Sequence, residues 1–91
     1  MIKDKSYGGM TDEERRLSDN ALEYINSLFG SDVNGVAYCL PYVSPTNSWN
    51  NSVNLVVKLD GYCVGYDMAF LYYDDEERGE VLELLEVKTR Y

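Results

Sequence analysis

The stretch SVNLVVKLDGYCVGYD, residues 52–67, decides the fold. Its first half alternates apolar and polar side chains with a period of two, which is the pattern of a β-strand with one buried face. Asp60-Gly61 then predicts a two-residue hairpin turn, because a type I′ turn needs positive φ at both central residues. Such a turn fixes the register. The pairs expected on the apolar side are Leu59–Tyr62, Val57–Val64, Leu55–Tyr66 and Val53–Met68, and those on the opposite side are Lys58–Cys63, Val56–Gly65 and Asn54–Asp67.

A helix is predicted before this hairpin, over residues 12–29. Thr11-Asp12-Glu13-Glu14 is a capping box, in which the Thr11 hydroxyl and the Glu14 carboxylate each accept the other residue's backbone N–H. Gly30 is placed to end the helix. The apolar face expected to pack on the sheet holds Leu17, Ala21, Leu22, Ile25, Leu28 and Phe29.

Two more strands are predicted around the hairpin. Residues 36–43 alternate, and Pro41 cannot donate a ladder hydrogen bond, which indicates an edge strand or a bulge. Residues 80–89 fit a strand with a bulge at Leu84-Leu85, or a helix with Glu76, Glu80 and Glu83 on one face; the terminal sequence VKTRY favours the strand. Trp49, in the polar loop 44–51, is open to two interpretations: a lid on the core or an interface anchor.

The predicted fold class is therefore α+β. One N-terminal helix packs on a four-stranded antiparallel β-sheet in meander order. Residues 1–10, with Gly8-Gly9, are expected to form a flexible N-terminal arm, and residues 11–91 a single domain.

The composition of the 91 residues excludes several functions. There is no histidine, which removes Ser-His and Cys-His catalysis and any His-based zinc site. Cys39 and Cys63 form no CxxC pair and are expected to be reduced, mostly buried thiols of a cytoplasmic protein. The sequence shows no signal peptide and no apolar run long enough to span a membrane. We expect no enzymatic activity and no cofactor. We also expect no metal site, because the acidic run lacks the alternating spacing of a calcium loop.

All of the formal net charge comes from one segment. The protein carries a formal charge of −8, and residues 60–86 hold nine acids and one arginine, whereas the rest of the chain is balanced. A single-sign patch steers binding to a surface of opposite charge, so the expected partner is a basic protein surface rather than nucleic acid or a membrane. The candidate partner-binding residues are Asp67, Tyr73, Asp74, Asp75, Glu76, Glu77, Glu80 and Glu83.

The function favoured by these observations is inhibitory binding. Carboxylates on a strand and turn can stand in for phosphates and block a basic nucleic-acid-binding site on a protein or nuclease complex. In size, acidity and lack of a catalytic motif, the chain is similar to small phage-encoded anti-defence proteins such as anti-CRISPR or anti-restriction inhibitors; this similarity is one of overall character. The alternatives are a bacterial immunity protein against a cationic nuclease toxin, and a regulatory subunit that forms a homodimer through the outer sheet face.

Overall fold

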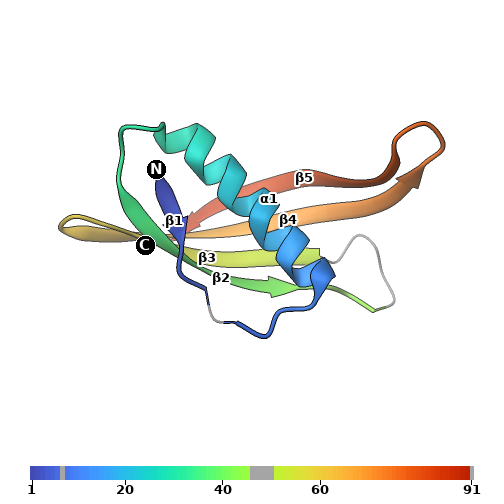
Figure 1. The fold of residues 1–91 in the computed structure, drawn as a ribbon, viewed down its shortest axis with the longest axis horizontal. Helices are drawn as coiled ribbons and strands as arrows, with labels where there is room; N and C mark the ends of the chain where they lie inside the picture. Colours follow the sequence, from blue (N-terminus) through green and yellow to red (C-terminus); the bar gives the residue numbers. More distant parts are fainter. Residues whose placement is uncertain (7, 46–50, 91) are drawn as a thin grey trace.

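The computed structural model describes residues 1–6, 8–45 and 51–90. Its elements are β1 (Ile2–Asp4), α1 (Asp12–Phe29), β2 (Gly35–Tyr42), β3 (Asn51–Leu59), β4 (Tyr62–Asp75) and β5 (Gly79–Arg90). They form one sheet in the order β1-β2-β3-β4-β5, and α1 crosses one of its faces (Figure 1). All neighbouring strands are antiparallel except β1, which runs parallel to β2. The α+β class is confirmed, with five strands in place of the four predicted.

The local signals around the helix are confirmed, and so are the length of the central hairpin turn and its register, but not the turn type. α1 has the predicted bounds and begins with the predicted capping box. The Glu14 N–H donates to Thr11 Oγ1 at 3.1 Å, and the Thr11 N–H donates to Glu14 Oε1 at 2.9 Å. Gly30 and Gly61 adopt positive φ, of 86° and 89°. Among the described residues no residue other than glycine does so, so Asp60 has negative φ and the two-residue turn is not of the predicted type I′. The β3–β4 register agrees with the prediction at every pair. Residues 79–90 form a strand, and its register skips Leu85 between Leu84 and Glu86, which confirms the bulge.

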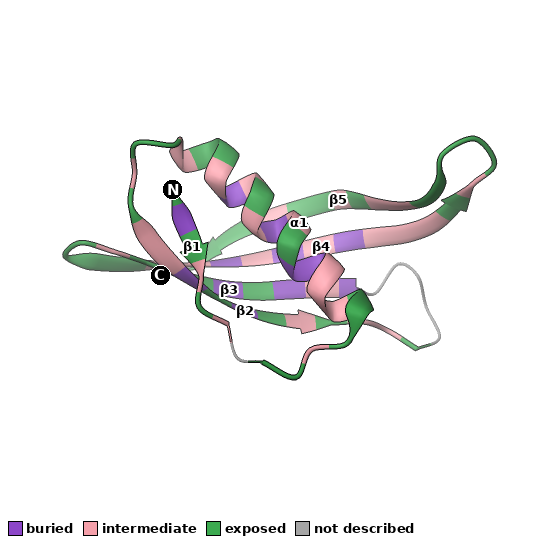
Figure 2. Ribbon diagram, viewed as in Figure 1, coloured by how far each residue is buried: buried purple, intermediate pink, exposed green. Residues whose placement is uncertain are grey.

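The core lies between α1 and the sheet face beneath it (Figure 2). Alternating residues of β3 and β4 turn toward the helix, so each strand buries every second side chain. The fully buried apolar residues are Ile2, Leu17, Ala21, Ile25, Ala37, Cys39, Val53, Leu55, Val57, Tyr66, Met68 and Phe70.

The fifth strand corrects the prediction of a loose arm over residues 2–4. Ile2 is only 1% exposed, and its backbone is held by the Asn26 side chain. Asn26 Oδ1 accepts the Ile2 N–H at 2.7 Å, and Asn26 Nδ2 donates to the Ile2 carbonyl at 3.1 Å. Asp4 forms an ion pair with Arg15 of α1. These contacts supply the burial and hydrogen bonds that offset the entropy of ordering a terminal segment.

Three other predictions are also wrong, and a fourth falls outside the described residues. Cys63 is exposed rather than buried, and Tyr62, expected on the core side, is 59% exposed. Both begin β4 at the β3–β4 turn, which projects beyond the end of α1 (Figure 1). Leu28, expected on the packed face of the helix, is 55% exposed. Trp49 lies outside the described residues.

The Asp4–Arg15 pair should give β1 a pH-dependent contribution to stability. Burial alone raises the pKa of Asp4, but hydrogen bonds from Ser6 and Arg15 outweigh it and leave the pKa below the usual 3.8. A carboxyl whose pKa is lowered by folding stabilises the protein above its unfolded pKa, and this stabilisation is lost as the pH falls through the folded value. Asp4→Asn should therefore lower the free energy of unfolding by about 1–3 kcal/mol at pH 7. In urea titrations the difference between the two proteins should shrink as the pH falls below the usual Asp pKa of 3.8; a difference that does not change with pH would contradict this assignment.

Candidate functional site

The β4–β5 hairpin extends beyond the rest of the sheet. β3 begins at Asn51, opposite Phe70, so residues 71–75 and 79–83 continue without β3 beside them. We call this two-stranded part, residues 71–83, the acidic ribbon. It projects from the body of the molecule, and its turn is exposed (Figures 1 and 2).

Asp75 has a structural role at the turn of the acidic ribbon. Its Oδ1 accepts the backbone N–H groups of Glu77 and Arg78 at 2.9 and 3.2 Å, and its Oδ2 lies 3.3 Å from the Arg78 guanidinium. These backbone hydrogen bonds, together with Arg78, hold the pKa of Asp75 below its usual value. Arg78 also donates to the Tyr73 hydroxyl at 3.2 Å. Asp75 and Tyr73, both predicted as contact residues, therefore shape the turn.

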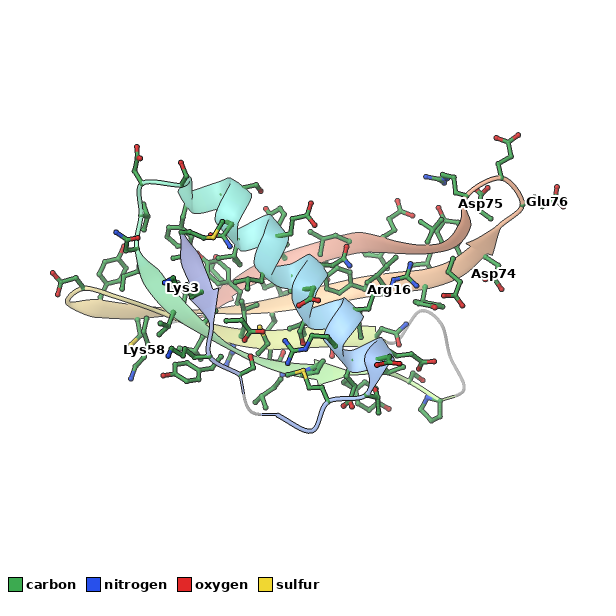
Figure 3. All side chains as sticks on the ribbon, in the orientation of Figure 1. Lys3, Arg16, Lys58, Asp74, Asp75 and Glu76 are labelled. Carbon is green, nitrogen blue, oxygen red and sulfur yellow. The ribbon has the colours of Figure 1, made fainter. Side chains whose placement is uncertain are left out.

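Three acids at this tip have no such role. Asp74, Glu76 and Glu77 are exposed, and within residues 1–6, 8–45 and 51–90 their carboxylates form no ion pair and no hydrogen bond. Figure 3 shows Asp74 and Glu76 at the far end of the acidic ribbon. At the tip of the acidic ribbon, these three carboxylates are the part of the predicted site that is free to meet a partner.

Glu80 is tied to the helix instead. It stands directly opposite Asp74 in the β4–β5 register, and like charges in that position repel. Arg16 of α1 counters this repulsion, since its Nη1 lies 2.9 Å from Glu80 Oε2 and its Nη2 donates to the Glu80 carbonyl at 2.9 Å. The Arg16 guanidinium also lies 5.4 Å from the ring centre of Tyr72. A hydrogen bond from the Tyr72 hydroxyl, with Arg16, lowers the pKa of Glu80.

Arg16→Gln should therefore destabilise the protein by about 1 kcal/mol, because it removes both the ion pair and the contact with the Tyr72 ring. Part of the loss comes from the repulsion between Asp74 and Glu80, which Arg16 no longer offsets. In a Glu80→Gln background the same substitution should cost less, as measured by urea unfolding at low salt. An equal loss in both backgrounds would show that Arg16 does not act through Glu80.

The remaining predicted residues lie away from the tip, on the sheet face opposite α1. Asp67, in the middle of β4, forms an ion pair with Arg90 Nε at 2.7 Å. Glu83 is exposed opposite Leu71. The structure thus gathers Tyr73, Asp74, Asp75, Glu76, Glu77, Glu80 and Glu83 in the acidic ribbon, with Glu83 at its base, and separates Asp67 from them.

The first turn of α1 adds acids that the sequence analysis assigned only to helix capping. Glu13 and Glu14 line a cleft of about 730 Å³ together with Leu17, Tyr72 and Leu82, so the start of the helix meets the base of the acidic ribbon there. The pKa of Tyr72 is raised chiefly by its hydrogen bond with Glu80, and the charge of Glu13 adds to the effect. Only the packing of α1 on the sheet brings Glu13 to this place, and no local sequence signal predicts it.

Other site types find no support in the part of the chain that the structure describes. No three His, Cys, Asp or Glu side chains there converge as ligands for a metal ion. No helix in the same residues has the length and apolar character needed to cross a membrane. The chain matches no protein-family model, no curated protein and no solved structure.

Proposed function

We propose that this protein is a small inhibitory binding protein whose acidic ribbon enters a cationic groove that otherwise holds nucleic acid. One observation carries the proposal: Asp74, Glu76 and Glu77 stand at the end of a ribbon that projects past the sheet, and no described residue pairs with their carboxylates. A narrow projection with several carboxylates can reach into a groove lined by arginine and lysine. Its attraction to such a groove has the same electrostatic origin as that of phosphates.

The charge arrangement in the ribbon supports a binding role over a purely structural one. Asp74 opposite Glu80 is an unfavourable cross-strand pair, and a neutral residue at position 74 would remove the repulsion. Acids that serve only solubility could be spread over the surface. Here they concentrate at the tip of the acidic ribbon, where the fold does not require this much charge. An interaction with a basic partner accounts for this cost in stability.

Two biological settings fit this chemistry. In a phage-type anti-defence protein, the target is the nucleic-acid-binding surface of a defence complex. In a bacterial immunity protein, it is a cationic nuclease toxin. A gene for a toxin immediately upstream would favour immunity, and a phage or mobile-element neighbourhood would favour anti-defence.

Affinity capture from the native host tests the proposal. The bait should be wild-type protein beside the variant Asp74→Asn/Glu76→Gln/Glu77→Gln, which leaves Asp75 and the turn intact. We expect a basic protein that binds only the wild-type bait and elutes with rising salt. Retention of the same partner by both baits, without salt dependence, would reject the acidic ribbon as the contact surface.

A further inference from the structure

No described element covers the sheet face opposite α1, here called the outer face, and this face is partly apolar. Leu40 is 68% exposed on it, and Tyr38 and Val56 are each 37% exposed. The cross-strand register places Tyr38 beside Val56 and Leu40 beside Asn54, so these side chains form one continuous patch over β2 and β3. Apolar side chains gathered in this way on a monomer indicate an interaction surface.

The two edges of the sheet are poorly suited to strand addition. The edge strand β1 is short, and the Asn26 side chain of α1 occupies the backbone N–H and carbonyl of Ile2. Beyond β1, β2 itself forms the edge. There Ala37 accepts the Lys5 N–H at 2.8 Å and Cys39 donates to Ser6 Oγ at 2.7 Å, so the odd-numbered residues of β2 turn their backbone groups outward. The next such residue is Pro41, which has no N–H to offer. The other edge strand, β5, is interrupted by the bulge at Leu85 and carries charges along its length. A partner is therefore directed to the outer face.

The charges on this face run from basic to acidic along the strands. Lys3 and Lys58 lie level with each other across β2 at one end (Figure 3). Glu83 lies toward the other end. Lys58 pairs with Cys63, which lies four residues before Asp67 in β4. Glu83 pairs with Leu71, which lies four residues after Asp67. Leu40 shares the middle row with Asp67, whose own charge is paired with Arg90.

We propose that the outer face binds a second copy of this chain, with the strands of the two copies antiparallel about a two-fold axis near Asp67. A rotation of this kind brings the Lys58 end of each copy onto the Glu83 end of the other, so the same favourable contact forms twice. It also brings Leu40 of one copy toward Leu40 of the other. The alternative two-fold axis, along the strands, would place the lysines of both copies together.

The dimensions of the face suit this arrangement. Four strands at ~4.8 Å spacing and the length of β3 give a face of roughly 600 Å² in projection, comparable with the ~800 Å² of accessible surface that each partner buries in a standard interface. Asp75 lies eight residues from Asp67 along β4, whereas Tyr62 lies five residues away in the other direction. The tip of each acidic ribbon therefore extends past its partner by about 10 Å. The dimer leaves both tips exposed, and this inference does not depend on the proposed function.

Sedimentation velocity in low salt tests the interface. Wild-type protein should sediment as a dimer of the 10.4 kDa chain, and Leu40→Glu should weaken the dimer by about 30-fold or more. Leu28→Glu is the matched control, since Leu28 is similarly exposed but lies on the helix side of the molecule, and it should dimerise as the wild type does. A monomeric wild type at 100 µM, or equal effects of the two substitutions, would overturn the proposal.

Charge reversal tests the antiparallel orientation. Lys58→Glu and Glu83→Lys should each weaken the dimer by about tenfold, because each creates two like-charged contacts. Mixing the two variants should restore dimers at wild-type concentrations, since every contact between unlike copies is again of opposite charge. The restored association of the mixture could not be explained by a loss of stability in either variant alone. Failure of the mixture to associate more strongly than its components would reject the antiparallel two-fold arrangement.

Discussion

Asp74→Asn/Glu76→Gln/Glu77→Gln should bind a deca-arginine peptide about tenfold more weakly than the wild type, by isothermal titration in low salt. These carboxylates project from the body of the protein and form no ion pair within the described residues. Exposed pairs contribute about 0.2–1 kcal/mol each, so three together account for a change of this size. The difference between the two proteins should shrink as the salt concentration rises.

The control is a variant with the same change in net charge at scattered positions. Glu23, Asp32 and Asp60 are exposed and lie in α1 or in turns away from the acidic ribbon. Glu23→Gln/Asp32→Asn/Asp60→Asn should bind the peptide nearly as tightly as the wild type. If both triple variants lose affinity equally, the affinity depends on the total charge of the protein and the acidic ribbon is not the binding site.

Phe70→Ala should produce the largest loss of stability of any single substitution discussed here. Phe70 is 2% exposed and pairs with Asn51 and Leu84 at the point where the acidic ribbon leaves the sheet. Removing a buried phenyl ring costs about 3–5 kcal/mol through lost burial and the cavity left behind. That is a large part of the 5–15 kcal/mol that stabilises a typical domain, so urea unfolding should show a much lower midpoint.

The comparison for Phe70→Ala is Val56→Ala. Val56 lies in the same sheet but on the outer face, where it is 37% exposed. Its truncation should change the free energy of unfolding of the monomer by about 0.5 kcal/mol or less. Losses of similar size at the two positions would contradict the assignment of the core to the α1 side of the sheet.

The sequence predicted those parts of the fold that depend on residues close together in the chain. The capping box fixes the start of α1, and Asp60-Gly61 fixes the register of β3 and β4, because both signals act over two to four residues. β1 could not be predicted in this way. Ile2 is held by Asn26 and pairs with Gly35, so the strand depends on contacts that are distant in sequence.

The candidate site shows the same division. The run of acids from Asp74 to Glu77 is visible in the sequence, and the structure places it at an exposed tip. The sequence does not show which cations pair with the acids, since Arg16 reaches Glu80 from the helix and Arg90 reaches Asp67 from the neighbouring strand β5. The exposure of Tyr62 likewise depends on where α1 ends above the sheet, which strand alternation does not specify. Cys63 pairs with Lys58 on the face opposite α1, so its exposure follows from the predicted register.

The most direct test of the central claim is a competition measurement on the partner captured from the host. Labelled nucleic acid is first bound to that partner, and its fluorescence anisotropy is followed as this protein is added. We predict that the wild type and the scattered-charge control release the nucleic acid at about one equivalent per binding site, and that Asp74→Asn/Glu76→Gln/Glu77→Gln does not. Nucleic acid that stays bound while the partner is saturated with wild-type protein would contradict the proposal that the acidic ribbon occupies the nucleic-acid-binding groove.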